Sequence, residues 1–154
     1  MSGWTDIMTA LSAPVAIAAT VWTIHAGSSK QREIGKEARA YALYYDYLKM
    51  CIEHPELSAW YLADASMKLP PPSDIWDSDS LGCSKYLWFV SYGLMAFDEM
   101  LSLATSKRWE GELRWFVESH QPVFEAIWDK EWKDEHSPRM GRLVDEVLRN
   151  SSNA

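Results

Sequence analysis

The pattern of apolar and polar positions changes once along this 154-residue chain, near residue 27. Residues 7–26 read IMTALSAPVAIAATVWTIHA and contain no Lys, Arg, Asp or Glu. As a helix, these 20 residues would be about 30 Å long, the thickness of a bilayer's hydrocarbon core. After residue 29, apolar residues recur every three or four positions between charged ones, a period that predicts amphipathic helices. The pattern predicts an all-α protein: one N-terminal transmembrane helix, then a small cytoplasmic helical-bundle domain.

The boundaries that follow are an anchor at 1–29, a helical domain at 30–149 and a disordered tail at 150–154. A cleaved signal peptide is one alternative, but no Lys or Arg precedes Lys30. A soluble or surface-lying helix is another. Positive charges follow the apolar run, which predicts the inner (cytoplasmic) membrane, a single pass and the N-terminus outside. These basic residues are Lys30, Arg32, Lys36 and Arg39.

Small and hydroxylated residues recur along the apolar run at spacings of 3 and 4, which places them on one helix face. A seam of this kind lets two helices approach closely and hydrogen-bond to each other. It predicts self-association or pairing with a partner's span, while an accident of composition and a pore built from several copies stay open as alternatives. The seam residues are Thr9, Ala13, Ala16, Thr20, Thr23 and Gly27.

The rest of the chain reads as helices separated by proline, with a stiff acidic loop at 68–80. The first helix can begin after a break at 27–29 or continue directly from the span. The expected helices are 30–52, 57–67, 84–105, 109–120, one opened by Pro122, and one opened by Pro138 and capped by Ser137.

Each expected helix has an apolar face that we assign to the core. In the first, the predicted inward positions are Ile34, Ala38, Tyr41, Tyr45, Leu48 and Ile52. In 84–105 they are Leu87, Val90, Leu94, Phe97 and Leu101, widened by Trp88, Phe89, Tyr92 and Met95. In the later helices they are Trp109, Leu113, Phe116, Val117, Phe124, Ile127, Trp128, Trp132, Leu143, Val144, Val147 and Leu148.

Charge and cysteine content exclude two classes of protein. The net charge is −7, and residues 40–154 alone carry 11 basic and 19 acidic side chains, a balance of −8. So acidic a domain argues against broad nucleic-acid binding, which requires cations matched to phosphates. Cys51 and Cys83 are too few for a disulfide scaffold and lack the spacing of a metal site.

Candidate chemistry is sparse. Phosphate-binding, dinucleotide-binding, serine-hydrolase and zinc-peptidase motifs are all missing from the sequence, so we expect no catalytic residue, no metal site and no cofactor. Lys107, Arg108 and Arg114 are the compact candidates for contact with an anion or ligand, with Arg139 and Arg142 next. Trp128 and Trp132 lie one turn apart on one face, and they form part of the core, an aromatic cage for a cationic or nucleobase ligand, or an interface.

Three short motifs carry a resemblance. They are Tyr47-Leu48 with His54-Pro-Glu-Leu57, Pro-Val-Phe-x-x-x-Trp at 122–128, and His-Ser-Pro at 136–138, behind an uncharged N-terminal run. With this order of motifs the chain resembles a loose group of small bacterial membrane-anchored helical proteins of unknown function. The resemblance implies a bacterial origin and a single span, and it assigns no catalytic residue.

We therefore expect a non-enzymatic, membrane-tethered interaction or sensor module with the lipid bilayer and a second copy or membrane protein as partners. The alternative is an oligomerising effector of a bacterial defence system that perturbs the membrane and is triggered through its cytoplasmic domain. An enzyme is a third class, but the sequence offers no converging acid–base groups.

Overall fold

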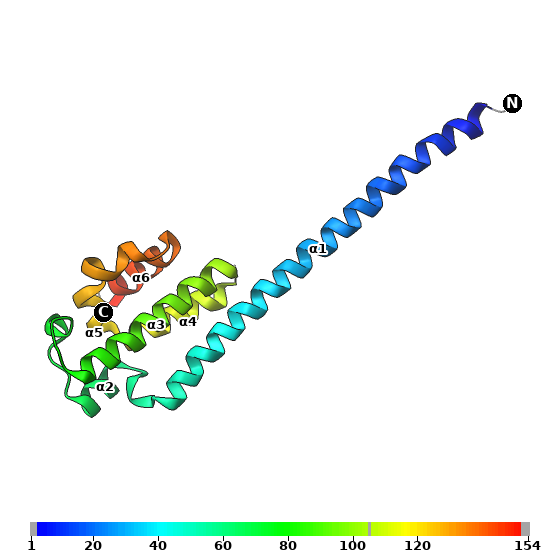
Figure 1. The fold of residues 1–154 in the computed structure, drawn as a ribbon. Coiled ribbons are helices and arrows are strands. Elements are labelled where there is room, and N and C mark those ends of the chain that lie inside the picture. The colour runs from blue at the N-terminus through cyan, green and yellow to red at the C-terminus, as the bar shows by residue number, and fades with distance from the viewer. Residues whose placement is uncertain (1–2, 105, 152–154) are drawn as a thin grey trace. The chain divides into compact units, whose positions relative to one another are not determined.

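The computed structural model describes the backbone of residues 3–104 and 106–151 and the side chains of residues 27–104 and 106–151. The described residues form helices and connecting loops and contain no strand, so the predicted all-α class is confirmed (Figure 1). The chain divides into two compact units, Met1–Glu37 and Ala38–Ala154. This division lies within helix α1, which continues past the expected boundary between 29 and 30.

Helix α1 (Gly3–Glu53) runs without interruption through the Gly-Ser-Ser sequence at 27–29, as one of the two sequence alternatives expects. The span predicted at 7–26 lies outside the residues whose side chains are described, and so do Thr9, Ala13, Ala16, Thr20 and Thr23 of the seam. Gly27 is described, and a Cβ added there would meet no atom within 4 Å. In the part of the chain with described side chains, no helix combines the length and apolarity that crossing a membrane requires.

The face of α1 that packs into the core overlaps the predicted one only in part: Tyr41 and Leu48 are half-buried against the core, whereas Ala38 is exposed. Ile34, Tyr45 and Ile52 are exposed, whereas Ala40 and Tyr47 are buried. The Tyr47 ring lies 5.3 Å from the Phe97 ring and 5.7 Å from the Phe116 ring, measured between centroids. The helix is apolar on two faces, and contact with these rings selects the face that carries Ala40 and Tyr47.

Two short helices and a loop follow. They are η1 (Pro55–Leu57), α2 (Trp60–Met67) and η2 (Pro72–Asp74). Lys68 ends α2 in the left-handed region with a φ of 53°. The predicted stiff loop from 68 to 80 contains one helical turn, η2. The fully buried Ile75 fixes this loop to the core.

Helix α3 (Leu81–Leu103) contributes more buried residues than any other described helix. It begins three residues before the predicted start because the Ser80 hydroxyl accepts a hydrogen bond from the Cys83 N–H at 3.1 Å and caps it. Helix α4 (Lys107–Ser119) begins in the same way, with Ser106 accepting from the Arg108 N–H. Helices α3 and α4 pack closely at Gly93, where an added Cβ would lie 2.7 Å from Phe116 Cζ.

The C-terminal part contains α5 (Gln121–Ile127), the π-helical turn η3 (Trp128–Trp132), η4 (Lys133–Glu135) and α6 (Pro138–Ser151). Ser137 caps α6 as predicted, with its hydroxyl accepting from the Met140 N–H at 3.3 Å. The helix continues to Ser151, two residues beyond the expected end of the domain, and the remainder of the predicted tail, 152–154, lies outside the described residues.

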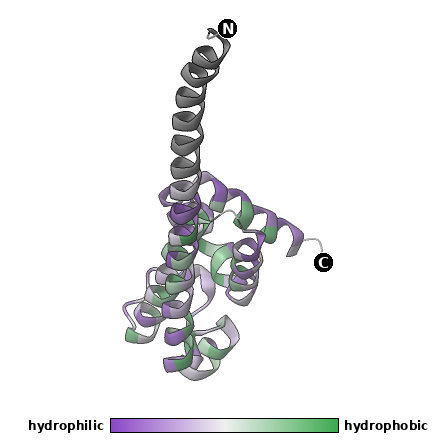
Figure 2. Ribbon diagram, turned by 90° about the vertical axis from the view of Figure 1, so that its right-hand side faces the viewer, coloured by the Kyte–Doolittle hydropathy of each residue, from purple (hydrophilic) through white to green (hydrophobic). Residues whose placement is uncertain are grey.

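Most of the largest fully buried side chains of the core are aromatic. In Figure 2, hydrophobic and hydrophilic residues alternate along the helices of the second unit, which is the pattern of amphipathic elements. The inward positions predicted for α4, α5 and α6 are buried, except that Leu148 is only half-buried. The large, fully buried side chains include Trp109, Trp128, Tyr47, Tyr86, Phe97, Phe116 and Phe124.

Candidate interaction groove on helix α3

The outer face of α3 carries large apolar side chains that contact solvent. Trp88 is 77% exposed and Met95 is 67% exposed, and Leu81 and Tyr92 are exposed as well. Their spacings of 7, 4 and 3 place all four on one side of the helix. The prediction that Trp88, Tyr92 and Met95 widen the core is therefore wrong, since α3 already fills the core with the residues of its opposite face. We call these four residues the apolar ridge.

A groove follows the ridge along α3. Three adjoining hollows, with volumes of about 360, 70 and 480 Å³, share lining residues from one to the next. Ser91 belongs to the first and second hollows, and Met95 and His136 belong to the second and third. Small side chains at Ser84 and Ser91 leave this space open between the ridge and the elements opposite.

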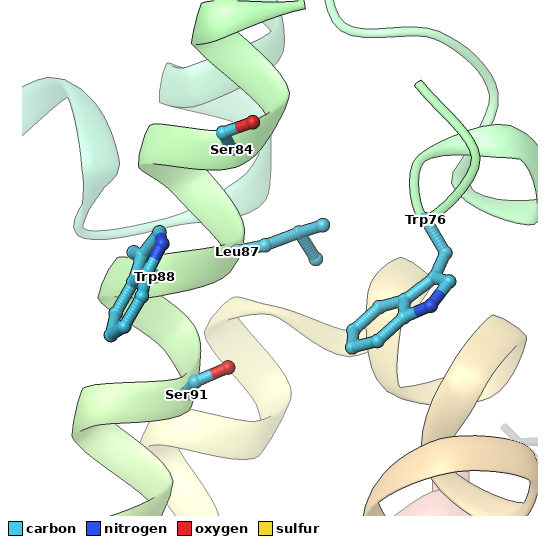
Figure 3. Close-up of a pocket in the computed structure, with 5 residues that line it drawn as sticks. All are labelled: Trp76, Ser84, Leu87, Trp88 and Ser91. Atoms are coloured by element: carbon cyan, nitrogen blue, oxygen red, sulfur yellow. The ribbon is translucent and has the colours of Figure 1, made fainter. Parts of the chain in front are cut away.

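The first hollow lies between α3 and the loop that follows η2. In Figure 3, the Leu87 side chain points from α3 toward the Trp76 ring, with Ser84 and Ser91 one turn to either side, and the Trp88 ring, which also lines the hollow, lies on the side of α3 away from Trp76. The Trp76 ring packs edge-on against the buried Trp132 ring at 6.2 Å between centroids, which holds this wall in place. The hollow can take one apolar or aromatic group.

The third hollow is acidic. Asp98, Glu99 and Glu135 line it together with His136 and Ser137. Asp98 accepts hydrogen bonds from the Ser137 N–H at 2.9 Å and from the Ser137 hydroxyl, and His136 Nδ1 lies 3.4 Å from Asp98 Oδ2. These bonds join the start of α6 to α3 and close that end of the groove.

Asp98, His136 and Ser137 are the residue types of a catalytic triad, but their order excludes that mechanism. In a triad the histidine stands between the carboxylate and the hydroxyl and removes the hydroxyl proton. Here the carboxylate stands between the other two, and the Ser137 hydroxyl also caps α6. His136 stacks on Trp128 with ring planes 11° apart. The three residues hold elements together.

The basic candidates from the sequence do not converge. Arg114 pairs with Glu146 at 2.8 Å. Arg108 lies over the Tyr41 ring, 5.2 Å from its centroid, and donates to the Tyr41 hydroxyl at 3.1 Å. Lys107 is exposed at the start of α4. Partners within the chain thus hold two of the three, so this structure supplies no shared anion site from them.

The two aromatic candidates, Trp128 and Trp132, do not form an exposed interface. Trp128 and Trp132 are 1% and 3% exposed. The Trp128 indole N–H donates to Asp145 Oδ1 at 3.0 Å, and the Trp132 ring packs 5.7 Å from the Phe124 ring. The core alternative is confirmed for this pair, apart from the edge of Trp132 that lines the second hollow.

The two remaining basic candidates, Arg139 and Arg142, lie on α6. Arg139 donates to the Leu101 carbonyl at 2.6 Å and to Glu110 at 2.9 Å, and Arg142 is exposed. Within 27–104 and 106–151, no three His, Cys, Asp or Glu side chains form a cluster that could hold a metal ion.

The sequence contains a signal for this groove, although the helical period alone does not distinguish it from a core face. The segment that forms α3 is apolar on more than half of its circumference, which is more than one helix of a small bundle can bury. The surplus positions, Leu81, Trp88, Tyr92 and Met95, already repeat at helical spacing in the sequence. What the sequence does not show is the opposite wall, because Trp76 lies in the loop just before α3 and His136 lies more than 30 residues after that helix ends, and only the fold brings both opposite it.

The chain matches no protein-family model, no curated protein and no solved structure.

Proposed function

We propose that this protein is a non-enzymatic, membrane-tethered interaction module whose helical domain binds a partner protein through the groove on α3. The observation that carries this proposal is the apolar ridge beside the groove. Exposed apolar patches bordered by polar residues are typical of protein-binding surfaces, and tryptophan and methionine are enriched at such interfaces. Trp88, 77% exposed, is the expected centre of binding energy.

The tether belongs to the same proposal and is supported by the sequence. The uncharged run at 7–26 has the length of a single span, and the basic residues after it favour the cytoplasmic face of the inner membrane. The seam that includes Ala16 and Thr20 would let two spans pair, so two copies of the domain would present two grooves to a partner.

The binding role is tested by placing the photo-cross-linking residue p-benzoylphenylalanine at position 88 of the full chain in cells. Position 115 is the matched control, because Trp115 is a 53% exposed tryptophan on α4, outside the groove. We expect a discrete protein adduct from position 88 and none from position 115. The absence of an adduct at 88, or the same adduct at both positions, would contradict the proposal.

The tether and its seam are tested by membrane fractionation and chemical cross-linking. We expect the wild type to remain in the membrane fraction after carbonate extraction, and Ala16→Leu with Thr20→Leu to remain there while losing its dimer band. Recovery of the wild type without detergent would overturn the tether. Depolarisation of cells by the wild type but not by the double variant would instead favour a membrane-perturbing effector.

A further inference from the structure

The groove has a length and a shape that a helix can fill. From Ser84 to Ser102, the lining residues of α3 extend over about 27 Å at 1.5 Å per residue. Serine at 84, 91 and 102 makes low points in this row, while the apolar ridge is high on one side and Trp76 is high on the other side at the first hollow. A low row between ridges is the surface into which the side chains of another helix pack.

The two ends of the groove differ in polarity. Trp76, Leu87 and Trp88 line the first hollow, and Asp98, Glu99 and Glu135 line the third. None of the described residues that line these hollows is a lysine or an arginine. Arg39 pairs with Glu99. Asp98 and Glu135 remain, so the acidic end keeps a net negative charge.

The same charge argues against a membrane as the occupant of the groove. Anionic headgroups attract basic surfaces and repel carboxylates. A helix that inserted the apolar ridge into a leaflet would bring Glu99 and Glu135 toward those headgroups, since both line the hollow next to Met95. A protein segment that is apolar at one end and basic at the other gains from both ends of the groove at once.

We propose that the occupant is an amphipathic helix of a partner protein, about 18 residues long, with an apolar or aromatic anchor at one end and lysine or arginine at the other. The anchor enters the hollow beside Trp76 and Trp88 (Figure 3), and the basic end lies against Asp98, Glu99 and Glu135. This inference rests on the proposed binding role of the groove and adds the chemistry of the partner.

Two synthetic helical peptides test the chemistry. Both have about 18 residues and leucine along one face, and the last two turns carry lysine in one and glutamate in the other. Binding is measured by fluorescence anisotropy to the full chain in nanodiscs of neutral phosphatidylcholine, at low and at high salt. We expect the lysine peptide to bind at least about tenfold more tightly than the glutamate peptide, with the difference shrinking as salt rises.

Four variants locate the two ends. Trp88→Ser should weaken binding of the lysine peptide about tenfold, and Glu135→Gln should weaken it several-fold and reduce its salt dependence. The matched controls are Trp115→Ser and Glu118→Gln, two exposed positions on α4. Both controls should bind as the wild type does.

Equal affinity for the two peptides, or equal losses in the α4 controls, overturns the basic-helix partner. If a partner adduct at position 88 still forms in cells, the binding role stands and only the chemistry of the partner is wrong. If the cross-linker at 88 reacts with nanodisc lipid in preference to the peptide, the groove face is a membrane contact and the proposal is overturned.

Discussion

The hydroxyl of Tyr86 on α3 lies 2.7 Å from Nδ1 of His120, and both side chains are fully buried. The rings of Phe116 and Phe89 lie 4.8 and 5.9 Å from the imidazole, and Nε2 has no hydrogen-bond partner among the described residues. Burial lowers the pKa of His120 to about 3 and raises the pKa of Tyr86. The histidine is therefore a neutral part of the core at physiological pH.

This pair makes stability depend on pH. The unfolded chain takes up a proton at His120 near its ordinary pKa of 6.5, whereas the folded chain does not until about pH 3. Between these values the free energy of unfolding should fall as pH falls, by up to about 1.4 kcal/mol per pH unit. Urea titrations of the full chain in detergent between pH 7 and pH 4 measure this slope.

The control for the pH effect is His120→Asn, which keeps an acceptor for the Tyr86 hydroxyl but cannot titrate. It should unfold about 2 kcal/mol more easily at pH 7, because a buried ring is lost. The difference in unfolding free energy between this variant and the wild type should shrink as pH falls below 6.5. A constant difference across the pH range would show that His120 does not resist protonation in the folded state.

Gly93 is required by the close contact between α3 and α4. Gly93→Ala should cost about 1–3 kcal/mol of unfolding free energy, because the new Cβ would lie 2.7 Å from Phe116 Cζ in a packed core. The control is Gly111→Ala on α4, where a Cβ meets nothing within 4 Å. That change should stabilise the protein by up to about 1 kcal/mol through helix propensity. Chemical denaturation measures both changes in unfolding free energy. A loss in Gly93→Ala with a gain in Gly111→Ala confirms the contact, and changes of the same sign refute it.

Arg139 connects three helices. From α6 it donates to the Leu101 carbonyl near the end of α3 and to Glu110 on α4, at 2.6 and 2.9 Å. Arg139→Met should lower the unfolding free energy by about 2 kcal/mol. Arg139→Lys should restore little, because an ammonium lacks the planar, forked donors. The exposed Arg142 on the same helix is the control, and loss of stability in Arg142→Met would contradict the assignment.

The different placement of two tryptophans predicts different mutational costs. Trp128→Ser should destabilise the fold by more than about 3 kcal/mol, since a buried ring and its hydrogen bond to Asp145 are lost. Trp88→Ser should change the unfolding free energy by less than about 0.5 kcal/mol. A large loss in Trp88→Ser would place that side chain in the core and remove the basis of the groove.

An ion pair between Lys133 of η4 and Asp145 of α6 links these two elements. Burial works to raise the pKa of the Asp145 carboxyl, but hydrogen bonds from Lys133 and Trp128 outweigh it and hold the pKa below its usual range. Because the folded-state pKa is lowered, this stabilisation is present at neutral pH and should be lost as pH falls through the acid range. Asp145→Asn should flatten that part of the acid denaturation curve measured by tryptophan fluorescence.

The existence of the helices and most of their ends could be predicted because both depend on neighbouring residues. A 3–4 apolar period, a proline that cannot continue a helix and a serine that caps one all act within a few positions. Ser137 and Pro138 begin α6 as predicted, and Trp109, Leu113, Phe116 and Val117 face inward as predicted.

Which face of a helix becomes the core could not be predicted where more than one face is apolar, because the choice depends on the elements that the helix meets. Helix α1 presents Tyr47 to Phe97 and Phe116 and leaves Tyr45 exposed, although both tyrosines fit an apolar period. Helix α3 buries Val90 and leaves Trp88 in solvent.

The sequence by itself determined an all-helical chain, its breaks and caps, and an uncharged N-terminal run followed by basic residues. Only the tertiary structure decided that a groove exists, because the row from Ser84 to Ser102 becomes a groove when Trp76 and His136 are brought opposite it. Helix formation is local, whereas the hollows are made by elements that meet only after the chain has packed.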